Sequence, residues 1–197
     1  MTTVFKNGCE KILQIFYKEK LGAFHLRELA RRTGLNENSA TRFLKVMTEE
    51  KLLEYVREGN MKKYSITKGN FVFSIFSVFD ALEYEKLPSI RRRAISRFYE
   101  RLDEKPVFLV LFGSVAKGTY KENSDLDLLA VFNKRIDVRN AEDYAESQTG
   151  IKINCVKIGY GDFLNEIKTE KDKLIASAIS SGYPLINHIK YYEEVLG

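Results

Sequence analysis

The second half of the chain alternates short apolar runs with amphipathic stretches. Residues 107–112 and 128–132 are uninterrupted apolar runs with the length of buried β-strands, and residues 151–158 predict a third strand. Sequence spacing predicts covering helices over 137–148, 162–168, 170–181 and 186–196. Strands interleaved with helices in this way predict a small α/β domain with a mixed sheet.

The N-terminal third of the chain shows a helical pattern instead. Apolar residues at helical spacing predict a helix within residues 4–20 and a short helix over 26–33 that ends at Gly34. Asn36 or Asn38 can cap the next helix, whose apolar stripe follows directly. A short helix, a glycine turn and a second helix form the pattern of a helix-turn-helix.

A predicted hairpin follows these helices. Residues 52–56 and 63–67 read as two short strands, and Gly59-Asn60 between them is turn chemistry flanked by basic residues. His25, just before the short helix, is expected to be a capping or surface residue rather than a ligand.

Residues 69–87 are apolar at most positions, which is unusual for a surface helix. A helix that is apolar nearly all round must be buried. Two interpretations remain open: an internal seam between two domains, or a homodimer interface. Pro88 starts a further helix over 89–104, and its three arginines, 91–93, are either phosphate contacts or, more often in such runs, a solvated face.

Positive charge is concentrated in the N-terminal part of the chain, although the net charge of the 197 residues is only +5. Residues 1–68 hold 14 Lys and Arg against 8 Asp and Glu. Residues 69–104 are balanced, and residues 105–197 hold 12 basic residues against 13 acidic ones. A basic domain joined to a near-neutral one predicts that the first binds a polyanion.

Composition also indicates the setting in which the protein works. No apolar run approaches the roughly 20 residues that span a bilayer, and the start, MTTVFKNGCEK, lacks the pattern of a signal peptide. Cys9 and Cys155 have neither metal-site spacing nor the density of a disulfide scaffold. We therefore expect a cytoplasmic protein without membrane contact.

The strongest chemical signal lies between the first two predicted strands of the second half. Gly113-Ser114 ends one strand, and Asp125 and Asp127 stand at the start of the next. Residues two apart on a strand share a face, so both carboxylates point the same way. They repel each other unless a cation lies between them, and Mg²⁺ fits because it prefers oxygen ligands and brings substrate phosphates. The small-residue turn offers N–H groups and a hydroxyl to those phosphates, which predicts metal-assisted phosphoryl chemistry.

These residues carry a family resemblance. Gly113-Ser114-x-Ala116-x-Gly118, followed by Ser124-Asp125-x-Asp127-Leu128, resembles the signature of the DNA polymerase β-like nucleotidyltransferase superfamily, especially its minimal prokaryotic members. The resemblance implies that Asp125 and Asp127 hold Mg²⁺ and that a nucleoside triphosphate is bound by Gly113, Ser114, Lys117 and Ser124. It also implies transfer of a nucleoside monophosphate to a hydroxyl, and a HEPN-type partner protein, although no residue here requires such a partner.

The third catalytic position departs from the family pattern. The family generally supplies a third carboxylate from the strand after the intervening helix, and the matching residue here is Asn154. Asparagine offers a carbonyl oxygen but no charge, so a second metal should be held more weakly. Asp162, just past that strand, is a less favoured substitute. The sequence thus supports nucleotide binding better than transfer.

The N-terminal pattern resembles the winged-helix domains of prokaryotic MarR-like and ArsR-like regulators over about residues 5–68. In such domains the second helix of the motif enters the major groove of double-stranded DNA, and the hairpin contacts the backbone or minor groove. The residues expected to contact DNA are Asn38, Ser39, Thr41, Arg42, Lys45, Arg57, Lys62 and Lys63.

Together these patterns predict an α+β protein in three parts. Residues 1–68 form a winged helix-turn-helix domain, 69–104 connecting or dimerisation helices, and 105–197 a nucleotidyltransferase-like domain. Two functions remain open. The chain is either an enzyme that transfers a nucleoside monophosphate to a protein or small-molecule hydroxyl, or a DNA-binding regulator whose second domain senses nucleotide and does little chemistry. Asn154 and the basic N-terminal part favour the regulator.

Overall fold

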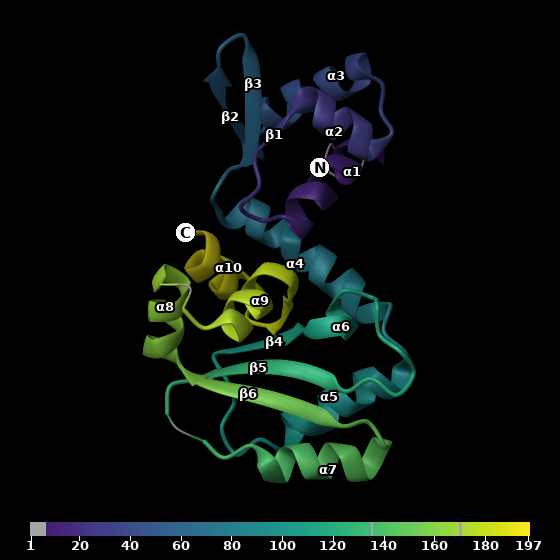
Figure 1. The fold of residues 1–197 in the computed structure, drawn as a ribbon, viewed down its shortest axis with the longest axis vertical. Helices are drawn as coiled ribbons and strands as arrows, with labels where there is room; N and C mark the ends of the chain where they lie inside the picture. Colours follow the sequence, from purple (N-terminus) through teal and green to yellow (C-terminus); the bar gives the residue numbers. More distant parts are fainter. Residues whose placement is uncertain (1–6, 135, 170) are drawn as a thin grey trace. The chain divides into compact units, whose positions relative to one another are not determined.

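The structure, a computed structural model, describes residues 7–134, 136–169 and 171–197 (Figure 1). The chain forms two compact units, one ending at Phe76 and including residues 196–197, the other Ser77–Val195. The division falls within one helix, α4 (Asn70–Glu85). No helix in the described ranges has the length and apolar character needed to cross a membrane.

The N-terminal unit is a winged helix-turn-helix, as predicted. Its remaining elements are α1 (Asn7–Lys18), β1 (Phe24–His25), α2 (Leu26–Thr33), α3 (Glu37–Glu49), β2 (Leu53–Glu58) and β3 (Met61–Ile66). The strands form an antiparallel sheet in the order β1-β3-β2. The first three residues of the segment predicted to hold a helix, 4–6, lie outside the described residues.

Local signals set the ends of these elements. Gly34 ends α2 in the left-handed conformation with φ of 70°, and the Asn36 side chain caps α3 by accepting the Ser39 N–H at 2.8 Å. The hairpin strands extend further toward the turn than predicted, and only Gly59 and Asn60 lie between them. His25, expected to be a capping or surface residue, occupies the N-cap position of α2 and is partly exposed, but its side chain makes no capping hydrogen bond.

The second unit is built around a four-stranded mixed sheet. Its elements are α5 (Ser89–Arg101), β4 (Phe108–Phe112), α6 (Gly113–Ala116), β5 (Leu126–Phe132), α7 (Arg139–Thr149), β6 (Ile153–Gly159), α8 (Tyr160–Thr169), α9 (Lys173–Ser181), β7 (Tyr183–Ile186) and α10 (His188–Leu196). The strand order is β6-β5-β4-β7, and of the neighbouring pairs only β5 and β6 run parallel. The mixed sheet predicted from sequence is confirmed, whereas β7, which lies between two predicted helices, was not predicted.

Helices cover both faces of this sheet (Figure 1). On one face Leu109, Leu128 and Ala130 belong to a core shared with α5 and α7. On the other face Phe108 packs against Phe163 of α8 and Tyr191 of α10. Because side chains alternate between the faces of a strand, this division also decides which face each polar residue occupies.

Helix α4 is less completely buried than its sequence predicts. Its Val72, Phe73, Ile75, Phe76 and Phe79 are buried. Phe71, Val78 and Leu82 are 58%, 42% and 48% exposed, so the described part of the chain does not cover this side of the helix, and its burial in a homodimer interface stays a prediction.

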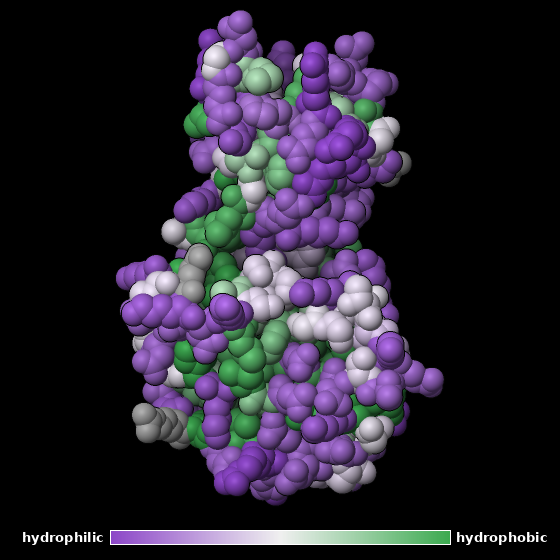
Figure 2. Space-filling model, in the orientation of Figure 1, coloured by the Kyte–Doolittle hydropathy of each residue, from purple (hydrophilic) through white to green (hydrophobic). Residues whose placement is uncertain are grey.

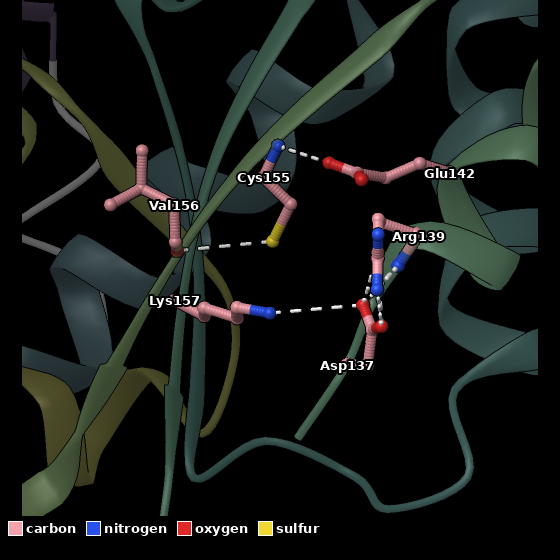
Figure 3. Close-up of polar contacts among 6 residues, drawn as sticks. All are labelled: Asp137, Arg139, Glu142, Cys155, Val156 and Lys157. Atoms are coloured by element: carbon pink, nitrogen blue, oxygen red, sulfur yellow. Dashed lines mark hydrogen bonds and ion pairs between the residues drawn. The ribbon is translucent and has the colours of Figure 1, made fainter. Parts of the chain in front are cut away.

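The outer edge of β6 is protected by a side chain (Figure 3). The Cys155 N–H, on the side of β6 that faces away from β5, donates to Glu142 Oε1 of α7 at 2.7 Å. Burial raises the pKa of the Cys155 thiol to about 12, so this cysteine is a packing residue rather than a nucleophile. Nearby, hydrogen bonds from Arg139 hold the pKa of Asp137 below its usual range, and Lys157 lies 3.8 Å from the same carboxylate.

Candidate functional site

The turn after β4 brings a backbone and a carboxylate together. Gly113 has φ of +74°, a conformation that favours glycine. A Cβ at this position would overlap Oδ2 of Asp127, so the carboxylate lies directly over the glycine. The turn continues as the single-turn helix α6 rather than as an open loop.

Three sequence-predicted residues meet beside this turn. Asp125 immediately precedes β5, and Asp127 is paired with Phe112 of β4 on one side and with Asn154 of β6 on the other. The Asn154 amide donates to Asp125 Oδ2 at 3.2 Å and, in a longer contact, to Asp127 Oδ1 at 3.4 Å. The register of the sheet therefore places Asn154 against both carboxylates.

The negative charge of Asp125 and Asp127 is partly balanced by one lysine, Lys152. Both are half-buried, and Lys152 Nζ lies 3.8 Å from Asp125 Oδ2. Within the described ranges no three acidic, histidine or cysteine residues gather in a metal-binding group. The protein thus offers two carboxylates, which suits a hard cation that takes its other oxygen ligands from phosphates or water.

Asp162 cannot stand in for a third carboxylate at this site. It lies beside Gly159, at the end of β6, whereas Asn154 lies near the start of that strand. Five residues of strand separate these two positions, which is roughly 16 Å. The alternative in which Asp162 reaches the carboxylate pair is therefore wrong.

The other predicted nucleotide-binding residues lie on the connection between β4 and β5. The Ser114 carbonyl accepts the Thr119 N–H at 3.0 Å, and the Ser124 hydroxyl accepts the Lys121 N–H at 2.9 Å. Lys117 is exposed at the end of α6, and none of the described contacts joins it to a carboxylate. The structure therefore brings Gly113 to the carboxylate pair, uses Ser124 to shape the loop, and leaves Lys117 on the surface.

Arg91 supports this loop and was missed from the sequence. It is 2% exposed, and its guanidinium donates to the carbonyls of Lys121 at 3.2 Å, Glu122 at 2.8 Å and Ser124 at 2.8 Å. The guanidinium also lies 4.7 Å from the Tyr120 ring centroid. The interpretation of the arginine run as a solvated face is wrong for Arg91, which acts through the loop that leads into Asp125.

A signal for Arg91 was present in the sequence. It lies three, four and seven residues before the buried Ala94, Ile95 and Phe98, which is the spacing of one helix face. An arginine on an apolar helix face has to find acceptors in the interior.

Replacing Gly113 by alanine is expected to displace the Asp127 carboxylate and to destabilise the protein by about 2 kcal/mol. Gly118→Ala is a matched control, because Gly118 also has positive φ but its Cβ would meet nothing within 4 Å. Gly113→Ala should lower the free energy of unfolding, measured in urea, more than Gly118→Ala does. It should also lower the Mn²⁺ affinity, measured by electron paramagnetic resonance, more than the control. Equal effects of the two substitutions would show that the contact with Asp127 is unimportant.

The predicted DNA-contacting residues of α3 lie on its outer side. Asn38, Thr41, Arg42 and Lys45 are exposed, while Ser39 is half-buried. On the face shown in Figure 2, hydrophilic side chains cover most of this unit. This side of α3 is opposite the buried Ala40, Leu44 and Met47.

The wing carries the second group of predicted DNA contacts. Arg57 and Lys62 are exposed, with Lys62 Nζ 3.9 Å from the centroid of the Tyr55 ring. Lys63 forms an ion pair with Glu58 at 3.0 Å, and its hydrogen bond holds the pKa of that carboxyl below the usual value. His25 joins the wing to β1, with Nδ1 3.1 Å from the Lys62 carbonyl oxygen. The wing is therefore held to β1 in its outer half, close to the tip where its cationic residues lie.

Two domain models match separate parts of the chain. Residues 92–183 match the model of the nucleotidyltransferase domain, and residues 11–57 match the model of the IclR helix-turn-helix domain. No curated protein shows significant similarity to the chain.

Two solved structures are similar to parts of this chain. One is the homodimeric winged helix-turn-helix DNA-binding domain of Mb0332 from Mycobacterium bovis, a possible ArsR-family regulator, with 24% identity, a TM-score of 0.36, and coverage of 42% of this chain and 73% of that one. The other is the crystal structure of a toxin–antitoxin with AMP-PNP. Its sequence is 16% identical, the TM-score is 0.39, and the match covers 54% of this chain and 82% of that one. Both TM-scores are below 0.5, so neither likeness supports an inference about function.

The assignment therefore rests on the domain models together with the motifs and the fold. The helix-turn-helix match ends within the wing, and the nucleotidyltransferase match contains both carboxylates and Asn154. The chain combines an N-terminal helix-turn-helix DNA-binding domain with a nucleotidyltransferase domain.

Proposed function

We propose that the second unit binds a Mg²⁺–nucleoside triphosphate at Asp125 and Asp127 and transfers its nucleoside monophosphate to a hydroxyl of a protein or small molecule. The convergence of both carboxylates with Asn154 over Gly113, within a nucleotidyltransferase domain, supports this proposal.

Each residue has a role that its position supports. Asp125 and Asp127 are the metal ligands, and a bound Mg²⁺ supplies positive charge against the phosphates and the leaving pyrophosphate. Gly113 has no side chain, so the Asp127 carboxylate can lie against the turn whose backbone N–H groups are the proposed phosphate donors. Ser114 and Lys117 follow it on α6 and its end, where they can meet the terminal phosphates.

In the reaction, the acceptor oxygen forms a bond with the α-phosphorus, the bond to the leaving pyrophosphate breaks, and the hydroxyl loses its proton to water. Asn154 cannot accept that proton and adds no negative charge to the site. We therefore expect transfer to be slow compared with a site that has three carboxylates, and nucleotide binding to be retained.

Transfer is tested with ATP labelled at either the α- or the γ-phosphate, in the presence of Mg²⁺ and candidate acceptors. The acceptor should become labelled only when the label is in the α-phosphate. Asp125→Asn should reduce the transfer rate about 100-fold or more through loss of a metal ligand. Asp162→Asn removes the same charge at the far end of β6 and should leave the rate unchanged. Transfer that survives Asp125→Asn would overturn the assignment of this carboxylate.

On the strength of the motif resemblance alone, a HEPN-type protein is the proposed partner that supplies a hydroxyl. Labelling of such a protein, but not of the chain itself, in the same assay would support it. Labelling of neither would leave the nucleotide-sensor function as the better description.

DNA-dependent regulation is the second candidate function. It is favoured by the exposed Arg42, Arg57 and Lys62, which form no ion pair with an acidic residue among the described contacts. Binding to duplex DNA should weaken steeply as salt rises, and Arg42→Ala should lower the affinity several-fold. Arg97→Ala, which removes an arginine paired with Glu100 in the other unit, is the control and should have no effect. Absence of duplex binding at low salt would exclude this function.

A further inference from the structure

A cavity of about 330 Å³ lies at the β7 edge of the sheet in the second unit. Its walls include Tyr84 of α4, Ile95 and Tyr99 of α5, Leu109 of β4 and Ile186 of β7. Cavities of this size with mostly apolar walls and a few polar groups are typical of sites for small molecules.

This cavity is separate from the carboxylate site. Leu109 and Phe112 are three residues apart on β4, so their side chains occupy opposite faces of the sheet. Asp127 is paired with Phe112 and shares its face. The cavity therefore belongs to the α5 side, and the two carboxylates to the other side.

One wall carries a buried carboxylate and an imidazole. Asp80 is fully buried, and its Oδ2 lies 2.8 Å from His188 Nδ1 while its Oδ1 accepts the Tyr192 hydroxyl at 2.8 Å. A carboxylate held against Nδ1 keeps a proton on that nitrogen and fixes the orientation of the ring. His188 also lines the cavity, and its Nε2 has no hydrogen-bond partner in the described part of the chain.

Two other polar groups on the wall are already engaged. The Tyr84 hydroxyl donates to the Arg92 carbonyl at 3.3 Å, and the Ser96 hydroxyl donates to Glu100 Oε1 at 2.9 Å. The His188 Nε2 is thus available to a ligand that lies in the cavity beside the rings of Tyr84 and Tyr99. A hydroxyl can both donate and accept, so it can pair with this nitrogen.

We propose that this cavity binds a small, mainly apolar alcohol or phenol whose hydroxyl pairs with His188 Nε2. The rings of Tyr84 and Tyr99 and the aliphatic side chains of the walls contact its apolar body. Asp80 acts through His188 as a positioning residue and does not itself contact the ligand.

The probes for a test on the full chain are 4-ethylphenol and ethylbenzene, which differ by one hydroxyl. Methyl NMR spectra of ¹³C-labelled isoleucine should show saturable shifts of Ile95 and Ile186. The native chain should bind 4-ethylphenol about tenfold more tightly than ethylbenzene, the effect of one hydrogen bond. Equal affinities, or shifts confined to other residues, would overturn the proposal.

Two variants test the hydrogen bond to His188 and the volume of the cavity separately. His188→Leu should bind both probes with equal affinity, and a retained preference for the phenol would contradict the role of Nε2. Ala81→Phe, at an exposed position that also lines the cavity, should weaken both probes. Should His188→Leu fail to fold by circular dichroism, the two probes on the native chain and on Ala81→Phe decide the outcome.

Discussion

Replacing Arg91 by methionine is expected to lower the free energy of unfolding by about 3 kcal/mol, because three loop carbonyls lose a charged donor. Methionine preserves much of the side-chain volume, so the loss reports on hydrogen bonding rather than on a cavity. The loop before Asp125 should loosen, and metal-dependent nucleotide binding should weaken with it. Urea unfolding measures the first effect, and titration of ATP in the presence of Mg²⁺ measures the second.

The neighbouring arginine is a matched control. Arg92 forms an ion pair with the exposed Glu85, and exposed pairs contribute little to stability. Arg92→Met should therefore change the free energy of unfolding by no more than about 0.5 kcal/mol. Arg91→Lys should recover only part of the loss, because one ammonium group cannot reproduce the planar fork of a guanidinium. An Arg91→Met protein as stable as Arg92→Met would disprove the role of this residue.

Replacing Asn154 by aspartate is expected to raise the affinity for Mn²⁺ about tenfold or more. The substitution exchanges an amide donor for a third carboxylate beside Asp125 and Asp127, which favours a bound cation. Without metal the same variant should be less stable than the native protein, because three carboxylates then repel one another. Electron paramagnetic resonance of Mn²⁺ gives the affinity, and thermal unfolding with and without the metal gives the linked stability.

Asn154→Ala shows whether a change in Mn²⁺ affinity comes from the added carboxylate of Asn154→Asp or only from the loss of the amide. It removes both donor contacts but adds no carboxylate, so it should not increase Mn²⁺ affinity to the same extent. A strong rise in transfer rate on Asn154→Asp would identify the native domain as a weakened transferase. If Asn154→Asp and Asn154→Ala bind Mn²⁺ equally, position 154 lies outside the metal site.

Local patterns were sufficient for much of this molecule. The helix-turn-helix, the hairpin and the apolar strands depend on periodicity, caps and turn residues that lie within a few positions of one another. The carboxylate pair could also be predicted, since Asp125 and Asp127 share a face on any strand.

Features that depend on distant partners were not predictable in this way. Strand β1 has two residues and β7 has four, and each exists because it pairs with a strand far away in sequence. The distance of Asp162 from the carboxylates follows from the length and direction of β6. Arg91 was missed because a run of three arginines resembles a solvated face, even though its helical position is apolar.

The position of Arg91 also determines how the nucleotidyltransferase part could be isolated. The matching region begins at residue 92, yet the residue just before it holds the loop that leads into Asp125. A recombinant fragment that starts at 92, or at the first strand of the sheet, would lack this internal guanidinium. An autonomous version has to begin upstream of Ser89, so that the helix and the loop it secures are expressed together.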